Sequence, residues 1–271
     1  MAERITSGQN PKIKDLLLLE SKSRERKARG LFVVEGRREY VRAVEAGFRT
    51  ETLFVREGEA EEVRADFVVS RQLYEKIACR EGTEGIVAVM QARERSLQDL
   101  HLSPSPLVLV LESVEKPGNL GAVLRSADAA GVDAVLVCDP LTDLYNPNLI
   151  RASLGAAFTV QCVACGSEEA YAWLKEKGIA ILTAQLQDSE LYYRTDMVRP
   201  VALVFGTEDK GLSDYWRQRA DAHIRIPMAG MMVPSTYRCR RPSLPSRPSG
   251  KETSKTISPD EIRSDRLSHS P

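Results

Sequence analysis

Two polar residues, Asn119 and Arg125, stand where a strand pattern gives way to a helix pattern. They follow the apolar run of residues 107–114 and a Pro117-Gly118 turn. Free backbone N–H groups at the start of such a helix attract an anion. Asn119 is placed to cap the helix, and Arg125 lies a little under two turns further along it. The same spacing also fits a capped helix whose arginine faces solvent, so both interpretations stay open.

A second candidate turn, GTEDKGL, follows the apolar strand pattern VALVFG of residues 201–206. Its glycines, Gly206 and Gly211, allow a ligand to approach the backbone closely. Glu208 would stand at the strand end as a free carboxylate. The spacing excludes a Walker phosphate loop and the GxGxxG dinucleotide fingerprint. An ordinary strand-to-helix turn is the alternative interpretation.

A third loop, MAGMM (228–232), follows the strand pattern HIRIP. Its methionines suit a flat apolar ligand that carries a cation, and they suit core filling equally well. No metal site is predicted, because the three histidines lack ligand spacing and Cys162-x-x-Cys165 lacks the second pair of a zinc ribbon.

The composition is typical of a soluble globular protein, with 42% hydrophobic residues, 28% charged residues and a net charge of zero. The apolar runs are far shorter than the roughly 18–20 residues that span a bilayer. The N-terminus lacks the apolar region of a secretory signal. Five scattered cysteines suit a reducing compartment, so we expect a cytoplasmic protein.

An α/β fold would position the three turns. Strand and helix patterns alternate over residues 107–227, which predicts a mainly parallel sheet. The expected strands cover residues 107–114, 133–138, 158–163, 179–184, 201–206 and 223–227, and the expected helices cover residues 120–130, 147–154 and 168–177. Ligands of such sheets bind beyond the carboxyl ends of the strands, where the three turns lie.

A smaller α/β unit over residues 1–100 precedes this sheet, with HLSPSP (101–106) as a linker. Its first helix is expected over residues 10–29, capped by Asn10. Further elements are expected at residues 31–36, 37–46, 52–55, 67–70, 71–77 and 85–91.

Charge is distributed unevenly along the chain. Residues 1–50 hold 12 Lys/Arg against 7 Asp/Glu, and residues 233–271 hold 8 against 4, so the middle of the chain is acidic. A basic arm on an acidic body suggests a polyanionic partner, although solvated helix faces give the same balance.

Taken together, these segments resemble the SpoU (TrmH) family of RNA ribose 2′-O-methyltransferases, in the SPOUT superfamily. The matching parts are ESVEKPGNLGAVLRSADAAGVDAVLV, LVFGTEDKGLS and IRIPMAGMM, in the family's order and spacing over about residues 107–232. Residues 4–90 are similar to the family's N-terminal substrate-binding domain, an L7Ae-like fold. The resemblance implies a methyltransferase domain over residues 107–232 after an RNA-binding domain over residues 1–100.

The resemblance also implies a cofactor and a reaction. S-adenosylmethionine would bind within a trefoil knot, against backbone near Thr183, Gly206, Ile226 and Met228. A ribose 2′-hydroxyl would attack the methylsulfonium in line, which requires orientation above all. Asn119, Arg125 and Glu208 match the family's catalytic residues.

The role of the arginine stays open. The family's arginine is proposed as the base, but a guanidinium is a poor base, so Arg125 can instead hold the adjacent phosphate and stabilise the developing alkoxide.

The implied partners are rRNA or tRNA and, with an intact C-terminal helix, a second copy of the chain. RNA binding should be salt-sensitive. The candidate RNA-binding residues are Lys12, Lys14, Lys22, Arg24, Arg26 and Lys27.

The family pattern stops after Met232. Residues 233–271 hold 6 of the 14 prolines and 9 serines, a composition that predicts disorder. When the codons are read in another frame, from the third base of the Val233 codon, their fixed bases permit the sequence Ser-Leu-Asn-Val-Ser-Val-Ser-Ala-Ala-Val-Leu-Ala-Phe-Glu-Ala-Val-Arg-Gln-Arg. This sequence matches the missing motif and helix of the family. We therefore infer a frameshift near codon 232–233, which resequencing tests.

Loss of the closing helix predicts an incomplete knot and a chain that is inactive or poorly folded. The rival hypothesis is an RNA-binding protein without catalysis that keeps a degenerate methyltransferase fold. Methylation of a base is a third hypothesis, against which the Asn119 and Arg125 pair argues.

Overall fold

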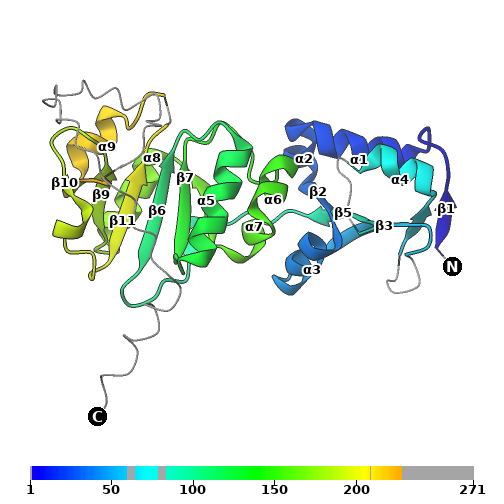
Figure 1. The fold of residues 1–271 in the computed structure, drawn as a ribbon, viewed down its shortest axis with the longest axis horizontal. Coiled ribbons are helices and arrows are strands. Elements are labelled where there is room, and N and C mark those ends of the chain that lie inside the picture. Colours follow the sequence, from blue (N-terminus) through cyan, green and yellow to red (C-terminus); the bar gives the residue numbers. More distant parts are fainter. Residues whose placement is uncertain (1, 60–64, 79–83, 208, 228–271) are drawn as a thin grey trace, which may run out of the picture. The chain divides into compact units, whose positions relative to one another are not determined.

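The computed structural model describes residues 2–59, 65–78, 84–207 and 209–227 (Figure 1). The expected tail, the frameshift and the knot depend on residues from 228 onward, which lie outside these ranges, so they stay predictions. No helix in the described ranges is long and apolar enough to span a membrane.

The N-terminal part contains a mixed five-stranded sheet in the order β1-β4-β3-β5-β2. Its strands are β1 (Glu3–Ile5), β2 (Leu31–Glu35), β3 (Thr50–Arg56), β4 (Phe67–Val69) and β5 (Ile86–Gln91), and its helices are α1 (Pro11–Ser21), α2 (Ser23–Arg29), α3 (Arg37–Glu45) and α4 (Arg71–Ile77). Strand β5 pairs antiparallel with β2 and β3, whereas β4 pairs parallel with β1 and β3. The expected strands of this part are present, as are the helices expected at residues 37–46 and 71–77, and β1 is an additional strand.

The single helix expected over residues 10–29 is two helices. The Asn10 side chain caps α1 as expected, accepting a bond from the Lys12 backbone N–H. The chain then leaves helical geometry at Lys22, whose φ and ψ are −117° and 106°. The Arg26 side chain donates to the carbonyl oxygens of Leu19 and Glu20, at 2.7 and 2.9 Å. These bonds satisfy carbonyl groups that the end of α1 would otherwise leave unpaired.

The second sheet has seven strands, all paired in parallel, in the order β10-β12-β9-β11-β6-β7-β8 (Figure 1). The strands are β6 (Leu107–Glu112), β7 (Ala134–Cys138), β8 (Cys162–Cys165), β9 (Ala180–Ala184), β10 (Glu190–Leu191), β11 (Val201–Phe205) and β12 (Ala222–Arg225). The prediction of an α/β fold with a parallel sheet is confirmed. Consecutive apolar residues form these strands because both faces of the sheet are covered.

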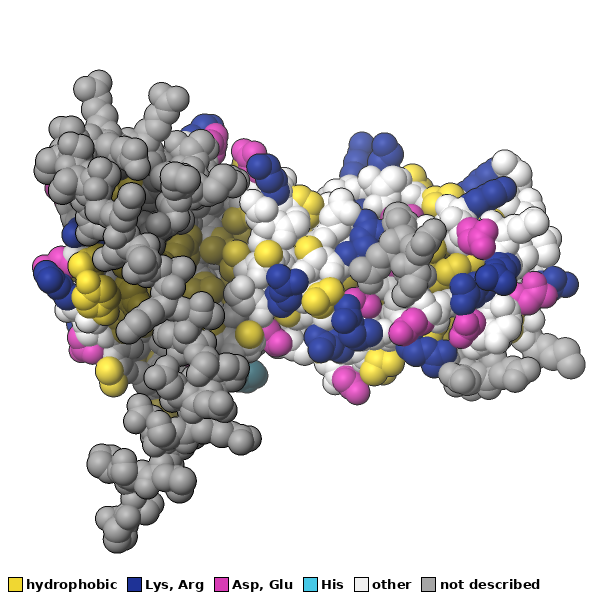
Figure 2. Space-filling model, in the orientation of Figure 1, with side chains coloured by type: hydrophobic (Ala, Val, Ile, Leu, Met, Phe, Trp, Pro, Cys, Tyr) yellow, Lys and Arg dark blue, Asp and Glu magenta, His cyan; other side chains and the backbone are white. Residues whose placement is uncertain are grey.

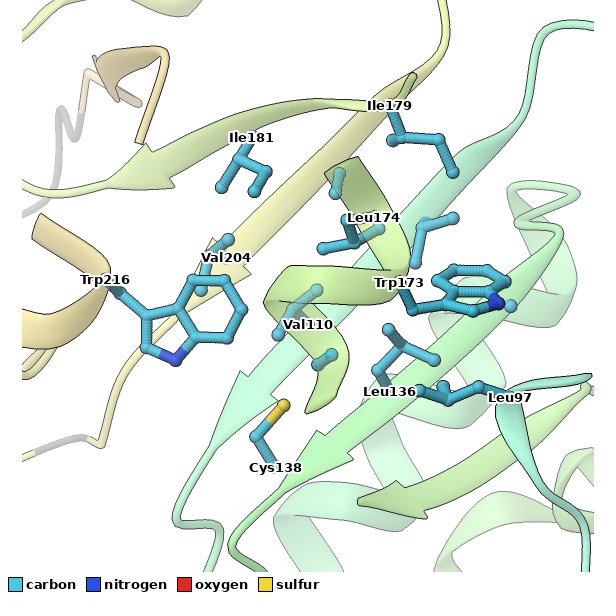
Figure 3. Close-up of a cluster of buried hydrophobic side chains, with 14 of the residues drawn as sticks. Leu97, Val110, Leu136, Cys138, Trp173, Leu174, Ile179, Ile181, Val204 and Trp216 are labelled. Carbon is cyan, nitrogen blue, oxygen red and sulfur yellow. The ribbon is translucent and has the colours of Figure 1, made fainter. Parts of the chain in front are cut away.

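Alternate residues of β6 face two different layers of helices. Val108 and Val110 belong to the cluster that includes Trp173 of α8 (Ser167–Glu176) and Trp216 of α9 (Asp214–Arg219) (Figure 3). Leu111 belongs to the cluster on the other face, formed with α5 (Pro117–Ala129), α6 (Pro147–Ser153) and α7 (Ala156–Thr159). Gly121 brings α5 against α6, since a Cβ there would lie 2.6 Å from the Leu149 carbonyl oxygen.

The strand expected over residues 158–163 is wrong at its start, because residues 156–159 form α7. Gly155 turns the chain with φ +92°, and the buried Ser153 hydroxyl accepts bonds from the backbone N–H groups of Gly155 and Ala157. These bonds to the first helical amides outweigh the strand propensity of Phe158 and Thr159. The strand begins instead at Cys162.

Asp133 ties the linker to the start of β6. Its carboxylate accepts bonds from the backbone N–H groups of Ser103 and Leu107, at 2.7 and 2.9 Å. Burial alone would raise the pKa of Asp133, but these hydrogen bonds hold the pKa below its ordinary value. The ionised form is therefore the one that stabilises the fold.

We expect Asp133→Ala to lower the free energy of unfolding by about 2 kcal/mol at pH 7, because two charge-assisted bonds are lost. Since the folded pKa lies below the unfolded value, this contribution is present at neutral pH and disappears as pH falls below about 4. Urea unfolding at pH 7 and at pH 3 measures it. If the free energy of unfolding differs between wild type and variant by as much at pH 3 as at pH 7, the ionised Asp133 carboxylate is not what stabilises the fold.

Candidate functional site

The candidate residues of three neighbouring strands lie at one edge of the sheet. Strands β12, β9 and β11 are neighbours and parallel, so their carboxyl ends meet there. Thr183 lies near the end of β9, Gly206 directly follows β11, and Ile226 directly follows β12. Met228 lies outside the described residues. The structure thus brings Thr183, Gly206 and Ile226 to the edge at which parallel sheets bind ligands.

Thr183 is fully buried, and its hydroxyl oxygen lies 2.6 Å from Nδ1 of His223, its register partner on β12. This bond holds the Thr183 side chain toward β12, so we expect the Thr183 position to offer a ligand mainly its backbone at the strand end. Ile226, in contrast, is 54% exposed and presents apolar surface at the same edge.

Gln185, the second residue after Thr183, carries a buried side-chain oxygen, Oε1, with no hydrogen-bond partner among the described residues. Its Nε2 donates to the Gln187 carbonyl oxygen at 2.9 Å, which holds the amide in place. An unpaired buried acceptor is unfavourable unless a ligand or water donates to it. The sequence patterns did not indicate Gln185.

The turn after β11 is closed on itself. Thr207 and Gly211 exchange two backbone hydrogen bonds of 3.1 and 3.0 Å, and Gly211 has φ +70°. Gly206 is required there, since a Cβ would lie 2.1 Å from the Gly211 carbonyl carbon. A hydrogen bond from the Thr207 side chain lowers the pKa of Asp209 below its ordinary value. Glu208 lies outside the described residues, so its catalytic role stays a prediction.

Glu112, at the end of β6, is a further residue that positions this edge, and the sequence analysis assigned it no role. It is buried, and its carboxylate accepts bonds from the Ser213 backbone N–H at 2.8 Å and the Ser213 hydroxyl at 2.6 Å. Ser213 is the residue before α9, so Glu112 fastens the chain that leaves the Gly206 turn to the neighbouring strand. Its only sequence signal is a carboxylate at the end of an apolar strand.

Asn119 does not cap α5, so that prediction is wrong. The helix starts at Pro117 with Lys116 in the cap position, which makes Asn119 its third residue. Proline is favoured at a first helical position, and here it starts the helix three residues earlier than the asparagine would.

Asn119 and Arg125 are both exposed, and six residues of helix place them on different sides of α5, about 120° apart. Within the described residues no hydrogen bond joins either side chain to Thr183, Gly206 or Ile226. A single chain therefore presents the pair on the helix surface, and their catalytic roles stay predictions.

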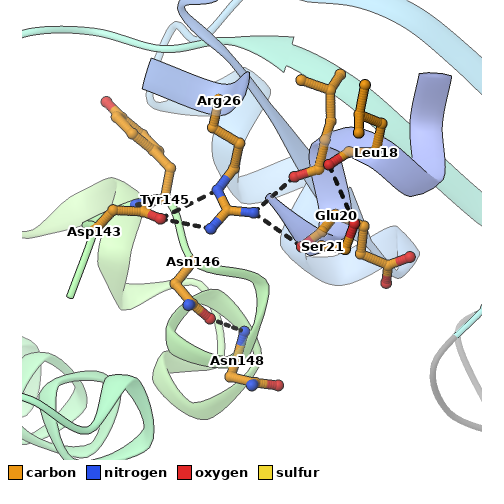
Figure 4. Close-up of polar contacts among 9 residues, drawn as sticks. Leu18, Glu20, Ser21, Arg26, Asp143, Tyr145, Asn146 and Asn148 are labelled. Carbon is orange, nitrogen blue, oxygen red and sulfur yellow. Dashed lines mark hydrogen bonds and ion pairs between the residues drawn. The ribbon is translucent and has the colours of Figure 1, made fainter. Parts of the chain in front are cut away.

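Arg26 is wrong as an RNA-binding residue. It is 4% exposed, and its Nε and Nη2 atoms contact Asp143 Oδ2 at 3.2 and 2.5 Å, while Nη1 binds carbonyl oxygens of α1 (Figure 4). Each of its three guanidinium nitrogens thus donates inside the protein. The other five candidates are exposed, namely Lys12, Lys14, Lys22, Arg24 and Lys27. The face drawn in Figure 2 mixes basic and acidic side chains over the surface.

Within the described ranges, no group of three or more His, Cys, Asp or Glu side chains is arranged to hold a metal. Cys165 pairs in register with Cys138 on β7, with 4.0 Å between the sulfur atoms, and the three cysteines of this region are free thiols. Burial raises the pKa of Cys162 to about 12, so its thiol stays protonated at neutral pH.

Two family models match the chain. The SpoU rRNA Methylase family matches residues 106–235, and the MRM3-like substrate binding domain matches residues 10–88. The 23S rRNA (guanosine(2553)-2′-O)-methyltransferase RlmP of Bacillus subtilis is 26% identical over 233 residues, which cover 84% of this chain and 92% of that relative.

Two solved structures share the fold. A crystal structure of an RNA 2′-O ribose methyltransferase is 36% identical, with a TM-score of 0.75 and coverage of 86% of this chain and 93% of that one. An AdoMet-bound rRNA methyltransferase from Sinorhizobium meliloti is 26% identical, with a TM-score of 0.77 and coverage of 86% and 91%.

The parallel sheet and its glycine-bordered turn thus define a protein of the SPOUT methyltransferase class. The chain belongs to the SpoU rRNA Methylase family, and the resemblance seen in the sequence is confirmed.

Proposed function

We propose that the chain is an enzyme that transfers a methyl group from S-adenosylmethionine to a ribose 2′-hydroxyl of rRNA. The observation that carries this proposal is the family match over residues 106–235, on a fold shared with an AdoMet-bound rRNA methyltransferase. The motifs alone allow rRNA or tRNA. The RlmP relative is named for 23S rRNA, which favours rRNA.

The residues at the sheet edge fit this cofactor. Ile226 offers exposed apolar surface for an adenine ring. Oε1 of Gln185, which has no partner in the described part of the chain, offers an acceptor for an amino or hydroxyl group. We propose that Thr183, Gly206, Ile226 and Met228 hold the cofactor, with Gln185 as an added contact. When bound, S-adenosylmethionine supplies the methyl group.

The remaining tasks are orientation and proton removal. We propose that Asn119 and Arg125 position the ribose and its phosphate, with Glu208 as the carboxylate of the second turn. Since both side chains of the pair stand on the outside of α5, they would act on a substrate held against that helix. A second copy of the chain beside α5 would complete such a site, so we propose a homodimer for a chain with an intact C-terminus.

We assign the N-terminal part, residues 1–100, to RNA binding and residues 107–232 to methyl transfer, joined by a linker at 101–106. The MRM3-like match over residues 10–88 supports the first assignment. Rather than Arg26, the exposed Lys12, Lys14, Lys22, Arg24 and Lys27 are the proposed phosphate contacts. We also propose a cytoplasmic location, because the proposed substrate is rRNA and the five scattered cysteines suit a reducing compartment.

A second candidate function is RNA binding without catalysis. The break of the family pattern after Met232 favours it, because the family match itself ends at residue 235. We therefore expect the chain as written to transfer methyl groups poorly, and the chain with the restored reading frame to transfer them well.

Methyl transfer from labelled S-adenosylmethionine to rRNA tests both functions. We expect Asn119→Ala and Arg125→Ala, in the frame-restored chain, each to lower the rate about 100-fold or more. Lys177→Ala, at the far end of α8, is the matched control and should leave the rate unchanged. Unchanged rates in the first two variants would remove these residues from the site, and no transfer by the frame-restored chain would favour the binding protein.

A further inference from the structure

Two adjacent tyrosines, Tyr192 and Tyr193, stand exposed between β10 and β11. Their side chains are 41% and 62% exposed, and their rings meet edge to face with centroids 5.4 Å apart. Among the described residues, neither tyrosine belongs to a hydrophobic cluster, whereas Met197 of the same segment packs against one. Large exposed aromatic groups that do not pack against a core are typical of binding surfaces.

The pair lies at the same edge as the candidate cofactor site. Leu191, the last residue of β10, pairs in parallel with Arg225, the last residue of β12. Tyr192 therefore lies just beyond the level at which β12 ends. Thr183 pairs with His223, two residues before Arg225. Tyr192 therefore lies three residues beyond the level of Thr183, which corresponds to roughly 10 Å along the strands.

The exposed charges next to the pair are mostly acidic. Arg194 follows the pair, but Asp188, Glu190 and Asp196 lie within a few residues of it and are exposed. Nη1 of Arg225 donates to the Ser189 carbonyl oxygen, and this guanidinium offsets only part of the acidic charge. Attraction to phosphate alone therefore gives this surface little affinity, and stacking on the rings must supply most of it.

We propose that Tyr192 and Tyr193 form a stacking platform, here called the tyrosine platform, for nucleobases of single-stranded RNA beside the methylated ribose. Aromatic side chains hold such bases with little sequence preference, because every base has a π-face. The proposal rests on the proposed function, since it takes the ligand to be the RNA substrate. It adds the requirement that bases next to the target are unpaired.

The test compares binding of two short single-stranded oligoribonucleotides by the full chain, one with all its bases and one with abasic positions in the middle. We expect the complete strand to bind about tenfold more tightly than the abasic strand. In the double variant Tyr192→Ala, Tyr193→Ala this ratio should fall to about one. The double variant Tyr192→Phe, Tyr193→Phe should keep the tenfold ratio, because both aromatic rings remain.

The double variant Arg24→Ala, Lys27→Ala is the matched control. It should weaken both strands equally and reduce the salt dependence, because it removes phosphate contacts and no stacking. Since both tyrosines are exposed, the alanine variants should keep the unfolding midpoint of the wild type.

A wild-type chain that does not distinguish the two strands, or does not bind either, overturns the platform. So does a ratio that survives the alanine substitutions. Methyl transfer is measured separately in the frame-restored chain. Its absence, with base-dependent binding intact, would refute the proposed function and leave the tyrosine platform standing.

Discussion

Replacing Asp143 with alanine should lower the free energy of unfolding by about 3–5 kcal/mol. Asp143 and Arg26 are 9% and 4% exposed, and the carboxylate receives two guanidinium bonds (Figure 4). Removing the carboxylate leaves a buried cation without its partner, which is far less favourable than losing a solvated ion pair. Urea unfolding of the full chain at neutral pH measures the loss.

The control for this prediction is an ion pair of equal length on the surface. Arg29 contacts Asp15 at 2.5 Å, as Arg26 contacts Asp143, but its side chains are 34% and 43% exposed. Arg29→Ala should therefore change the free energy of unfolding by less than about 1 kcal/mol. Equal effects of the two substitutions would show that burial of the Arg26 pair is not what makes it important.

Arg26 also shows the limit of sequence reasoning for this fold. In the sequence it is one of many basic residues on a helix, and nothing nearby distinguishes it from Arg24 or Lys27. Its partner, Asp143, lies 117 residues further along the chain. A contact between such distant segments is set by tertiary packing, which local charge patterns do not contain.

The parallel sheet was predictable because its signal is local. Each strand is a short apolar run followed by a helix pattern, and this alternation allows few other architectures. Helix starts were less predictable. Asn119 and Pro117 both favour a helix start, and α5 begins at Pro117. Strand β10 has two residues and carries no pattern of its own, because its place depends on pairing with β12.

The positions of the candidate site at the strand ends were predictable from the sequence, but several of the contacts that hold it were not. Gly206 could be placed from the strand and glycine pattern. Glu112 and Gln185 could not be placed from the sequence. Glu112 acts through Ser213, which is 101 residues away, and Gln185 stands out only because its buried Oε1 has no hydrogen-bond partner among the described residues.

Gly206→Ala should be the most damaging small substitution at this edge. The added Cβ would lie 2.1, 2.2 and 2.3 Å from backbone atoms of Gly211 and Leu212, distances that no side-chain rotation can relieve. The turn must open, which breaks the paired bonds between Thr207 and Gly211 and pulls the buried Leu212 from its cluster. We expect a loss of about 3 kcal/mol in the free energy of unfolding.

The same substitution should abolish binding of S-adenosylmethionine by the frame-restored chain, because the strand end and its turn form part of the proposed site. Gly118→Ala is the matched control, since a Cβ there meets nothing within 4 Å and alanine favours the helix α5. It should leave stability unchanged or raised by up to about 1 kcal/mol. Urea unfolding measures the effect on stability, and calorimetric titration with the cofactor measures the effect on affinity. A Gly206→Ala protein that keeps wild-type stability and affinity would show that this turn is neither closely packed nor part of the cofactor site.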